Sequence, residues 1–116
     1  MRVALTALAL LMAIALLGCR AQAGAAAAPV DTDRVEMALS YRFEPAVIRV
    51  PVGTTVTWRN SDNFTHSVKV LTGDYPSLDL RPGQSGSITF DRPGEFEYIC
   101  TYHAQNMKGK VIVVER

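Results

Sequence analysis

From residue 34 onward, short β-branched and aromatic runs alternate with clusters of Gly, Pro, Asn and Asp, and this rhythm restricts the chain to an all-β fold. Turn segments such as "RPGQSG" and "DRPGE" combine a Pro, which fixes φ, with a Gly that tolerates positive φ. No helical period persists beyond a few residues. The runs predict about seven strands, enough for a β-sandwich of two sheets, at residues 34–39, 46–50, 54–60, 67–71, 85–90, 95–100 and 110–114.

Alternation along these runs predicts which side chains face the core. Val56 and Trp58 share one face of their strand, because successive side chains of a strand point to opposite sides. Phe96 and Tyr98 lie on the same side of a later strand as Cys100. The sulfur of Cys100 is therefore expected to point inward, toward one end of the core.

The first 30 residues have a different character. Met1 and Arg2 give a positive start, and residues 3–17 are apolar except for Thr6. A run of this length is typical of a secretory leader and is short for a membrane span. It ends in "LLGC", which resembles the lipobox at which bacterial signal peptidase cleaves before a cysteine that is then lipidated. We therefore expect a lipoprotein signal peptide (1–18), an Ala-rich tether (19–33) and a single folded domain (34–116).

Lipidation of Cys19 would hold the exported protein on a membrane, at its periplasmic or cell-surface face, since each buried methylene adds about 0.8 kcal/mol of membrane affinity. The alternative is an ordinary signal peptide in which Cys19 is incidental. Loss of Arg2 with the leader leaves 12 − 1 = 11 basic side chains against 11 acidic ones. This balance gives no indication of a nucleic-acid partner, and we expect a monomer whose only membrane contact is the lipid.

Four possible metal ligands stand out in the predicted domain. The segment "CTYHAQNMKG" contains Cys100, His103 and Met107, and His66 is the other histidine of the chain. Singly, each has an ordinary explanation as a buried, packing or surface side chain. Together they form a soft donor set that favours copper. Zinc would accept the cysteine and both histidines, but methionine is a poor fourth ligand for it.

The sequence resembles the cupredoxins, the small blue copper proteins, and is nearest to their amicyanin and plastocyanin branch. The resemblance is carried by "FEPAVIRVPVGTTVTWRNSDNFTHSV", "FDRPGEFEYICTYH" and "MKGKVIVVE". It implies a Greek-key β-sandwich that binds one type 1 copper and shuttles single electrons between redox protein partners. It also implies that His66, Cys100 and His103 are equatorial ligands of the copper and that Met107 is the axial ligand.

The sequence departs from the family pattern in the ligand loop. Its spacing is C-x2-H-x3-M, between those of the amicyanins and the plastocyanins, so Gln105 or a backbone carbonyl is an alternative to Met107 as the axial ligand. The proline often found beside each family histidine is absent, and Thr65 and Tyr102 stand before the two histidines. The rigidity of the ligands must then come from other contacts.

Ser67 occupies a position where the family usually has Asn. In the family, the backbone amide of that residue bonds to the cysteine sulfur. We expect the N–H of Ser67 to donate to Cys100 and its hydroxyl to bond to the segment at Thr101, a brace around the metal ligands.

By the same resemblance, the edge of His103 would be the electron entry point, ringed by Tyr102, Phe64 and Ala104. The alternative for Tyr102 and Phe64 is that they simply cover the end of the core. A copper carrier or resistance protein is the alternative function, and a metal-free adhesive module would leave the clustered donors unexplained. We expect no enzymatic activity, because no spare histidines could build an open or second metal site.

Overall fold

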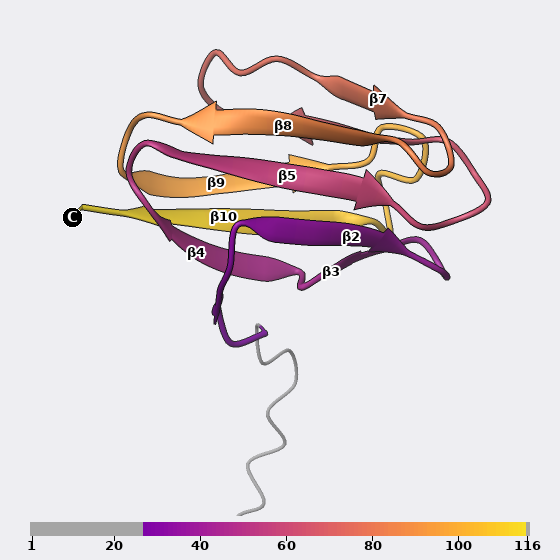
Figure 1. Cartoon of the computed structure of the whole chain (residues 1–116), viewed down its shortest axis with the longest axis horizontal. Helices are drawn as coiled ribbons and strands as arrows, with labels where there is room; N and C mark the ends of the chain where they lie inside the picture. The colour runs from indigo at the N-terminus through magenta and orange to yellow at the C-terminus, as the bar shows by residue number, and fades with distance from the viewer. Residues whose placement is uncertain (1–26, 116) are drawn as a thin grey trace, which may run out of the picture.

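The computed structural model describes residues 27–115, which form two packed β-sheets (Figure 1). The larger sheet has the strand order β1-β4-β10-β9-β6-β7 and the smaller one β3-β2-β5-β8. The ten strands of this described range are β1 (Val30–Asp31), β2 (Arg34–Ala38), β3 (Arg42–Glu44), β4 (Val47–Pro51), β5 (Thr54–Asn60), β6 (His66–Val70), β7 (Leu78–Leu80), β8 (Ser85–Phe90), β9 (Gly94–Ile99) and β10 (Lys108–Val114).

The predicted all-β sandwich is confirmed, and each of the seven predicted strands agrees with an observed strand to within two residues at either end. Strands β1, β3 and β7 were not predicted. Each is only two or three residues long and carries one or two apolar side chains, which is too little for an alternating pattern. Strand β1 lies inside the range assigned to the tether, because Val30 pairs in parallel with Ile48 of β4.

The predicted signal peptide 1–18, Cys19 and the tether up to residue 26 lie outside the described residues. Residues 27–29, at the end of the tether, have no regular secondary structure. Within residues 27–115, no helix has the length and apolar character needed to cross a membrane.

The core lies between the sheets and follows the predicted alternation. Val56 and Trp58 of β5 are buried, as are Phe96 and Tyr98 of β9. The Trp58 and Tyr98 rings meet edge to face with centroids 5.3 Å apart, an arrangement that adds to the free energy gained by burying them. Cys100 is fully buried just beyond Tyr98, so its predicted inward direction is confirmed.

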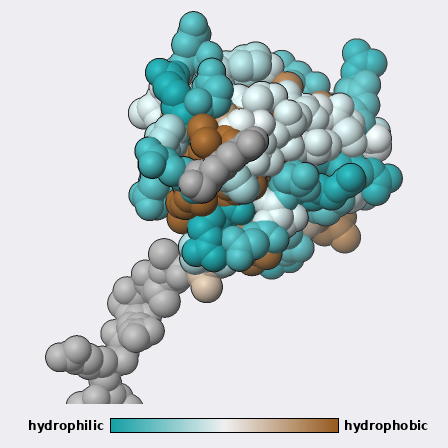
Figure 2. All heavy atoms as spheres, turned by 60° about the vertical axis from the view of Figure 1, so that its left-hand side comes forward, coloured by the Kyte–Doolittle hydropathy of each residue, from teal (hydrophilic) through white to brown (hydrophobic). Residues whose placement is uncertain are grey.

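Three connections meet at one end of the sandwich. They join β2 to β3, β5 to β6 and β9 to β10, and all three lie on the right of Figure 1. The last described residues follow β10 at the other end. Figure 2 turns that other end forward and shows hydrophilic side chains interspersed with smaller hydrophobic groups. The candidate ligands belong to the end with the three connections.

Candidate metal centre

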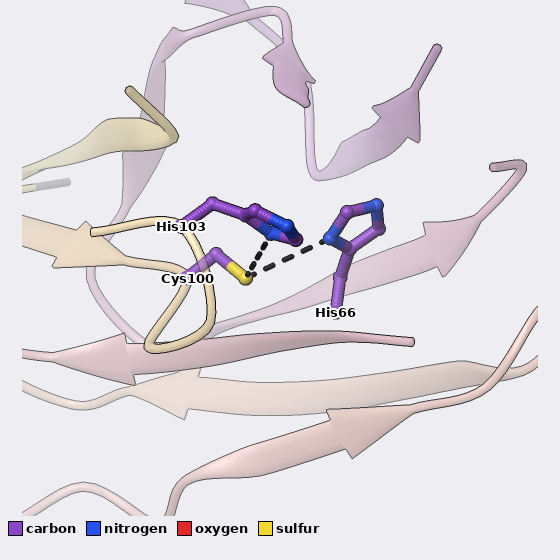
Figure 3. Close-up of side chains that lie close together, drawn as sticks. All are labelled: His66, Cys100 and His103. Atoms are coloured by element: carbon purple, nitrogen blue, oxygen red, sulfur yellow. Dashed lines mark hydrogen bonds between the residues drawn. The ribbon is translucent and has the colours of Figure 1, made fainter. Parts of the chain in front are cut away.

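His66, Cys100 and His103 converge at this end of the sandwich (Figure 3). The Cys100 sulfur lies 3.7 Å from Nδ1 of His66 and 3.8 Å from Nδ1 of His103. Nitrogen and sulfur ligands bound to one ion at about 2.1 and 2.3 Å, 120° apart, would be separated by about 3.8 Å. Both sulfur–nitrogen distances therefore fit ligands of a single ion, and the three donor atoms all lie within 4.8 Å of one another.

The loop between β9 and β10 holds its shape through backbone hydrogen bonds. The N–H of His103 donates to the Cys100 carbonyl at 3.2 Å, and that of Met107 donates to the His103 carbonyl at 2.9 Å. The N–H of Cys100 donates to the Met107 carbonyl at 3.0 Å, which closes the loop at its base. These bonds supply the rigidity that the absent prolines would have given.

Two of the three candidates for an axial ligand, Met107 and Gln105, differ in their burial. Met107 is fully buried at the base of the loop, where its carbonyl is tied to Cys100. The side chain of Gln105 is exposed. Burial thus favours the Met107 thioether over the Gln105 side chain.

The predicted brace at Ser67 is present. Its N–H donates to the Cys100 sulfur at 3.4 Å, and its hydroxyl lies 3.9 Å from the same sulfur. The hydroxyl also accepts from the Thr101 N–H at 2.7 Å and bonds to the Thr101 hydroxyl at 2.8 Å. Hydrogen bonds to a thiolate withdraw electron density from it, so this brace both orients the sulfur and tunes it.

Asp62 belongs to the candidate site and was missed by sequence reasoning. Its Oδ2 accepts from Nε2 of His66 at 2.8 Å, and its Oδ1 accepts from the Asn63 N–H at 2.7 Å. The carboxylate is buried, and the hydrogen bond from His66 holds the pKa of Asp62 below its usual value although burial alone would raise it. Because the proton sits on Nε2, the Nδ1 lone pair of His66 is free to face a metal.

Asn60 holds the loop that carries Asp62. Its side-chain amide donates to the carbonyls of Phe64 and Leu80 at 2.7 and 2.8 Å, and its oxygen accepts from the Asp62 N–H at 2.9 Å. The side chain is completely buried. A signal for this arrangement was available in "NSDNFTH", where an acidic residue precedes the histidine by four positions in a loop between strands.

The residues predicted to ring His103 lie at the surface. Phe64 and Tyr102 are 55% and 57% exposed, and Ala104 is also exposed. Rings exposed to this extent can contact a partner and still cover the end of the core with their other side. His103 itself is partly exposed, whereas His66 is fully buried. The Tyr102 hydroxyl donates to Asp79 of β7 at 3.0 Å, which fixes that ring beside the loop.

Comparison with known proteins leads to one family. The sequence matches the family described as "Cupredoxin-like domain" over residues 7–113. It is 36% identical over 112 residues to amicyanin-alpha of Methylorubrum extorquens, covering 92% of each chain. It is 36% identical over 83 residues to the chloroplastic plastocyanin of Tetradesmus obliquus, covering 61% of this chain and 57% of that protein. A solved structure of an oxidized amicyanin mutant aligns with a TM-score of 0.62 and 34% identity, covering 70% of this chain and 80% of that one.

Proposed function

The chain belongs to the cupredoxin-like family, as a type 1 blue copper protein related to amicyanin and plastocyanin, and from this premise we propose that it carries single electrons between redox partner proteins. Its cofactor is one copper ion, which supplies one-electron chemistry by alternating between Cu(II) and Cu(I). We assign His66, Cys100 and His103 as equatorial ligands and Met107 as the axial ligand. The observation that carries the proposal is the convergence of two imidazoles and a thiol that are restrained by the protein itself.

The restraints on the ligands suit electron transfer. Exchange is fast when the ligands move little between the two oxidation states, because little reorganisation is then required. Asp62 fixes the ring of His66, Ser67 fixes the sulfur of Cys100, and backbone hydrogen bonds fix the loop that carries the other two ligands. These contacts would hold the ligands in the same positions when the copper changes oxidation state.

The partly exposed edge of His103 would be the point where electrons enter and leave. Phe64, Tyr102 and Ala104 are the exposed neighbours that we assign to the contact with a redox partner. The near-zero charge predicted for the processed chain suits a contact formed mainly by apolar side chains, which would depend weakly on ionic strength.

Burial argues against the copper-carrier alternative. A carrier must release its ion readily, but His66, Cys100 and Met107 are all fully buried. Four protein donors also leave no open coordination position for a substrate, so we assign the chain no enzymatic role.

We further propose that the protein is exported and tethered as a monomer through lipidated Cys19. With β1 starting at Val30, a tether of residues 19–29 could extend at most about 40 Å from the membrane. Expression in a bacterium should give a membrane fraction that Cys19→Ser moves into the soluble fraction. Mass spectrometry should find acyl chains on residue 19 of the wild type. An unmodified Cys19, or equal amounts of the wild type and Cys19→Ser in the soluble fraction, would contradict the lipid anchor. Neither result would bear on the copper-site proposal.

The electron-transfer proposal is tested on the chain carrying Cys19→Ser, loaded with Cu(II). We expect an intense blue absorption that is lost in Cys100→Ser, and reversible one-electron voltammetry. Met107→Leu should keep the colour and raise the potential, because loss of the weak fourth donor leaves a more hydrophobic site of lower coordination number, which disfavours the more highly charged Cu(II). A folded chain without the blue colour, or one that releases copper at each reduction, would refute the proposal.

A further inference from the structure

Tyr41 lies in the connection between β2 and β3, at the metal end of the sandwich, with its backbone in the left-handed region. Its φ is 57°, and that of Ser40 is 69°. Such values suit Gly and Asn but are unfavourable for a bulky residue, because Cβ crowds the following carbonyl oxygen. A large aromatic side chain kept at this cost points to a function for the ring.

The ring of Tyr41 contacts both candidate histidine ligands. It stacks on His103 with centroids 4.2 Å apart and planes inclined by 33°, and it meets His66 nearly edge-on at 5.9 Å. On a further side it lies 5.8 Å from the ring of Phe64. Tyr41 follows a strand of the four-stranded sheet, whereas both histidines are carried by the six-stranded sheet. The stack therefore joins the two sheets across the metal centre.

The two imidazoles differ in their other restraints. Nε2 of His66 donates to the buried carboxylate of Asp62. Within residues 27–115, the ring of His103 has no comparable hydrogen bond, and its only ring-nitrogen interaction is that of Nδ1 with the Cys100 sulfur. The χ2 torsion of histidine has broad energy minima, so hydrogen bonds or packing must set the plane of the ring. The His103 ring packs against two rings: Tyr41, with centroids 4.2 Å apart and planes inclined by 33°, and His66, with centroids 5.3 Å apart and planes inclined by 61°. Tyr41 is the nearer and the more nearly parallel of the two.

We propose that Tyr41 is a positioning residue for the metal site, whose stacked ring holds the imidazole of His103 with Nδ1 directed at the copper in both oxidation states. The proposal rests on the ligand set proposed above, but it does not depend on electron transfer. A protein that binds copper without passing electrons would still need His103 held in this way.

Two variants separate the effect of the ring from that of the backbone. Tyr41→Phe keeps an aromatic ring, and Tyr41→Leu keeps apolar bulk without a ring. Both replacements have a Cβ, so the left-handed backbone disfavours each as it does tyrosine. Any difference between them therefore reports on stacking rather than on strain at the turn.

The first measurement is the release of Cu(I) from the full chain carrying Cys19→Ser into an excess of a Cu(I)-specific chelator. Aromatic pairs add about 0.5 to 1.5 kcal/mol of stabilisation beyond that of the area they bury. Tyr41→Leu should therefore release copper about 2- to 12-fold faster than the protein that keeps Tyr41. Tyr41→Phe should stay within about twofold of it, because the stack is kept. Circular dichroism and the melting temperature of each metal-free variant establish that it is folded.

The second measurement needs no copper. The ring protons of His103 should show an upfield ring-current shift in the proton NMR spectrum of the metal-free protein, kept in Tyr41→Phe and lost in Tyr41→Leu. Equal release rates in all three proteins would overturn the proposal, as would equal acceleration in both variants or ring protons unaffected by Tyr41→Leu. Failure of voltammetry alone would count against electron transfer and not against this role of Tyr41.

Discussion

Replacing Asp62 by Asn should raise the reduction potential of the copper. The substitution removes a buried negative charge next to His66 while keeping a side-chain oxygen that can accept from Nε2. A negative charge near the metal stabilises Cu(II) more than Cu(I), because the oxidised ion carries one more positive charge. Without that charge, the reduced form becomes relatively more stable.

The size of the effect follows from the geometry. The path from the carboxylate to the ion runs through the 2.8 Å hydrogen bond, the imidazole ring and the metal–nitrogen bond, about 7 Å in all. At an effective dielectric constant of 20, one unit charge at this distance contributes about 2.4 kcal/mol. For a one-electron couple this corresponds to a rise of roughly 100 mV.

The assay is voltammetry of the copper-loaded chain carrying Cys19→Ser, with Asp62→Asn compared with Asp74→Asn. Asp74 is an exposed carboxylate with no hydrogen bond or ion pair to any other described residue, so its loss removes the same formal charge far from any specific contact. The blue absorption should persist in both variants, as a sign that the ligand set is intact. A shift for Asp62→Asn no larger than that of the control, or a fall in potential, would refute the electrostatic role.

Three further predictions concern the brace, the core and the first strand. Ser67→Ala removes the hydroxyl that bonds to Thr101 and lies near the Cys100 sulfur. Urea titration should show a fall of about 1 to 2 kcal/mol in the free energy of unfolding. Voltammetry should show a slightly lower reduction potential, because a hydrogen-bond donor to the sulfur is lost. Gly109→Ala places a Cβ closer to the fully buried Tyr98 ring than van der Waals contact allows. Urea titration should therefore give a free energy of unfolding that is lower by about 1 to 3 kcal/mol. An unchanged free energy of unfolding would contradict this packing. Asp31 forms a two-point ion pair with Arg49 at 2.8 and 3.0 Å, and these hydrogen bonds lower the pKa of Asp31 in the folded protein below 3.8. The contribution of the ion pair to the stability of the fold is therefore fully present above pH 3.8. It is lost as the pH falls through the lowered pKa of the folded state. The protection factors of the β1 amides, corrected for the intrinsic exchange rate at each pH, should fall over that acidic range in the wild type, whereas in Asp31→Asn they should already be low at neutral pH.

Most of the fold was predictable because the longer strands alternate apolar and polar residues, which indicates their buried and exposed positions. In β5 and β8 the buried and exposed positions alternate over six or seven residues, and the predicted bounds agree with the observed ones. Strands β1, β3 and β7 are instead defined by their neighbours. "VD", for example, becomes a strand only because β4 offers an edge with which it can pair.

The candidate site divides in the same way. Cys100, His103 and Met107 could be found because they are close together in the sequence, and His66 because it is the other histidine of the chain. Asp62 has only a weak signal, its position four residues before His66, and the fold is what brings Asp62 and Tyr41 onto the two imidazoles. No local pattern distinguishes Tyr41, since its left-handed backbone and its contact across the sheets are both tertiary features.

The different supports of the two imidazoles follow from where each one lies. A hydrogen bond contributes little net free energy at an exposed site, because water offers competing partners, but an unsatisfied group in the interior is costly. The buried His66 is accordingly fixed by a buried carboxylate. The partly exposed His103 would gain little orientation from an outer hydrogen bond, whereas a stacked ring restrains its plane and excludes water from one face. In the described part of the chain, Nε2 of His103 has no hydrogen bond to another residue, which is compatible with the electron entry point proposed at that edge.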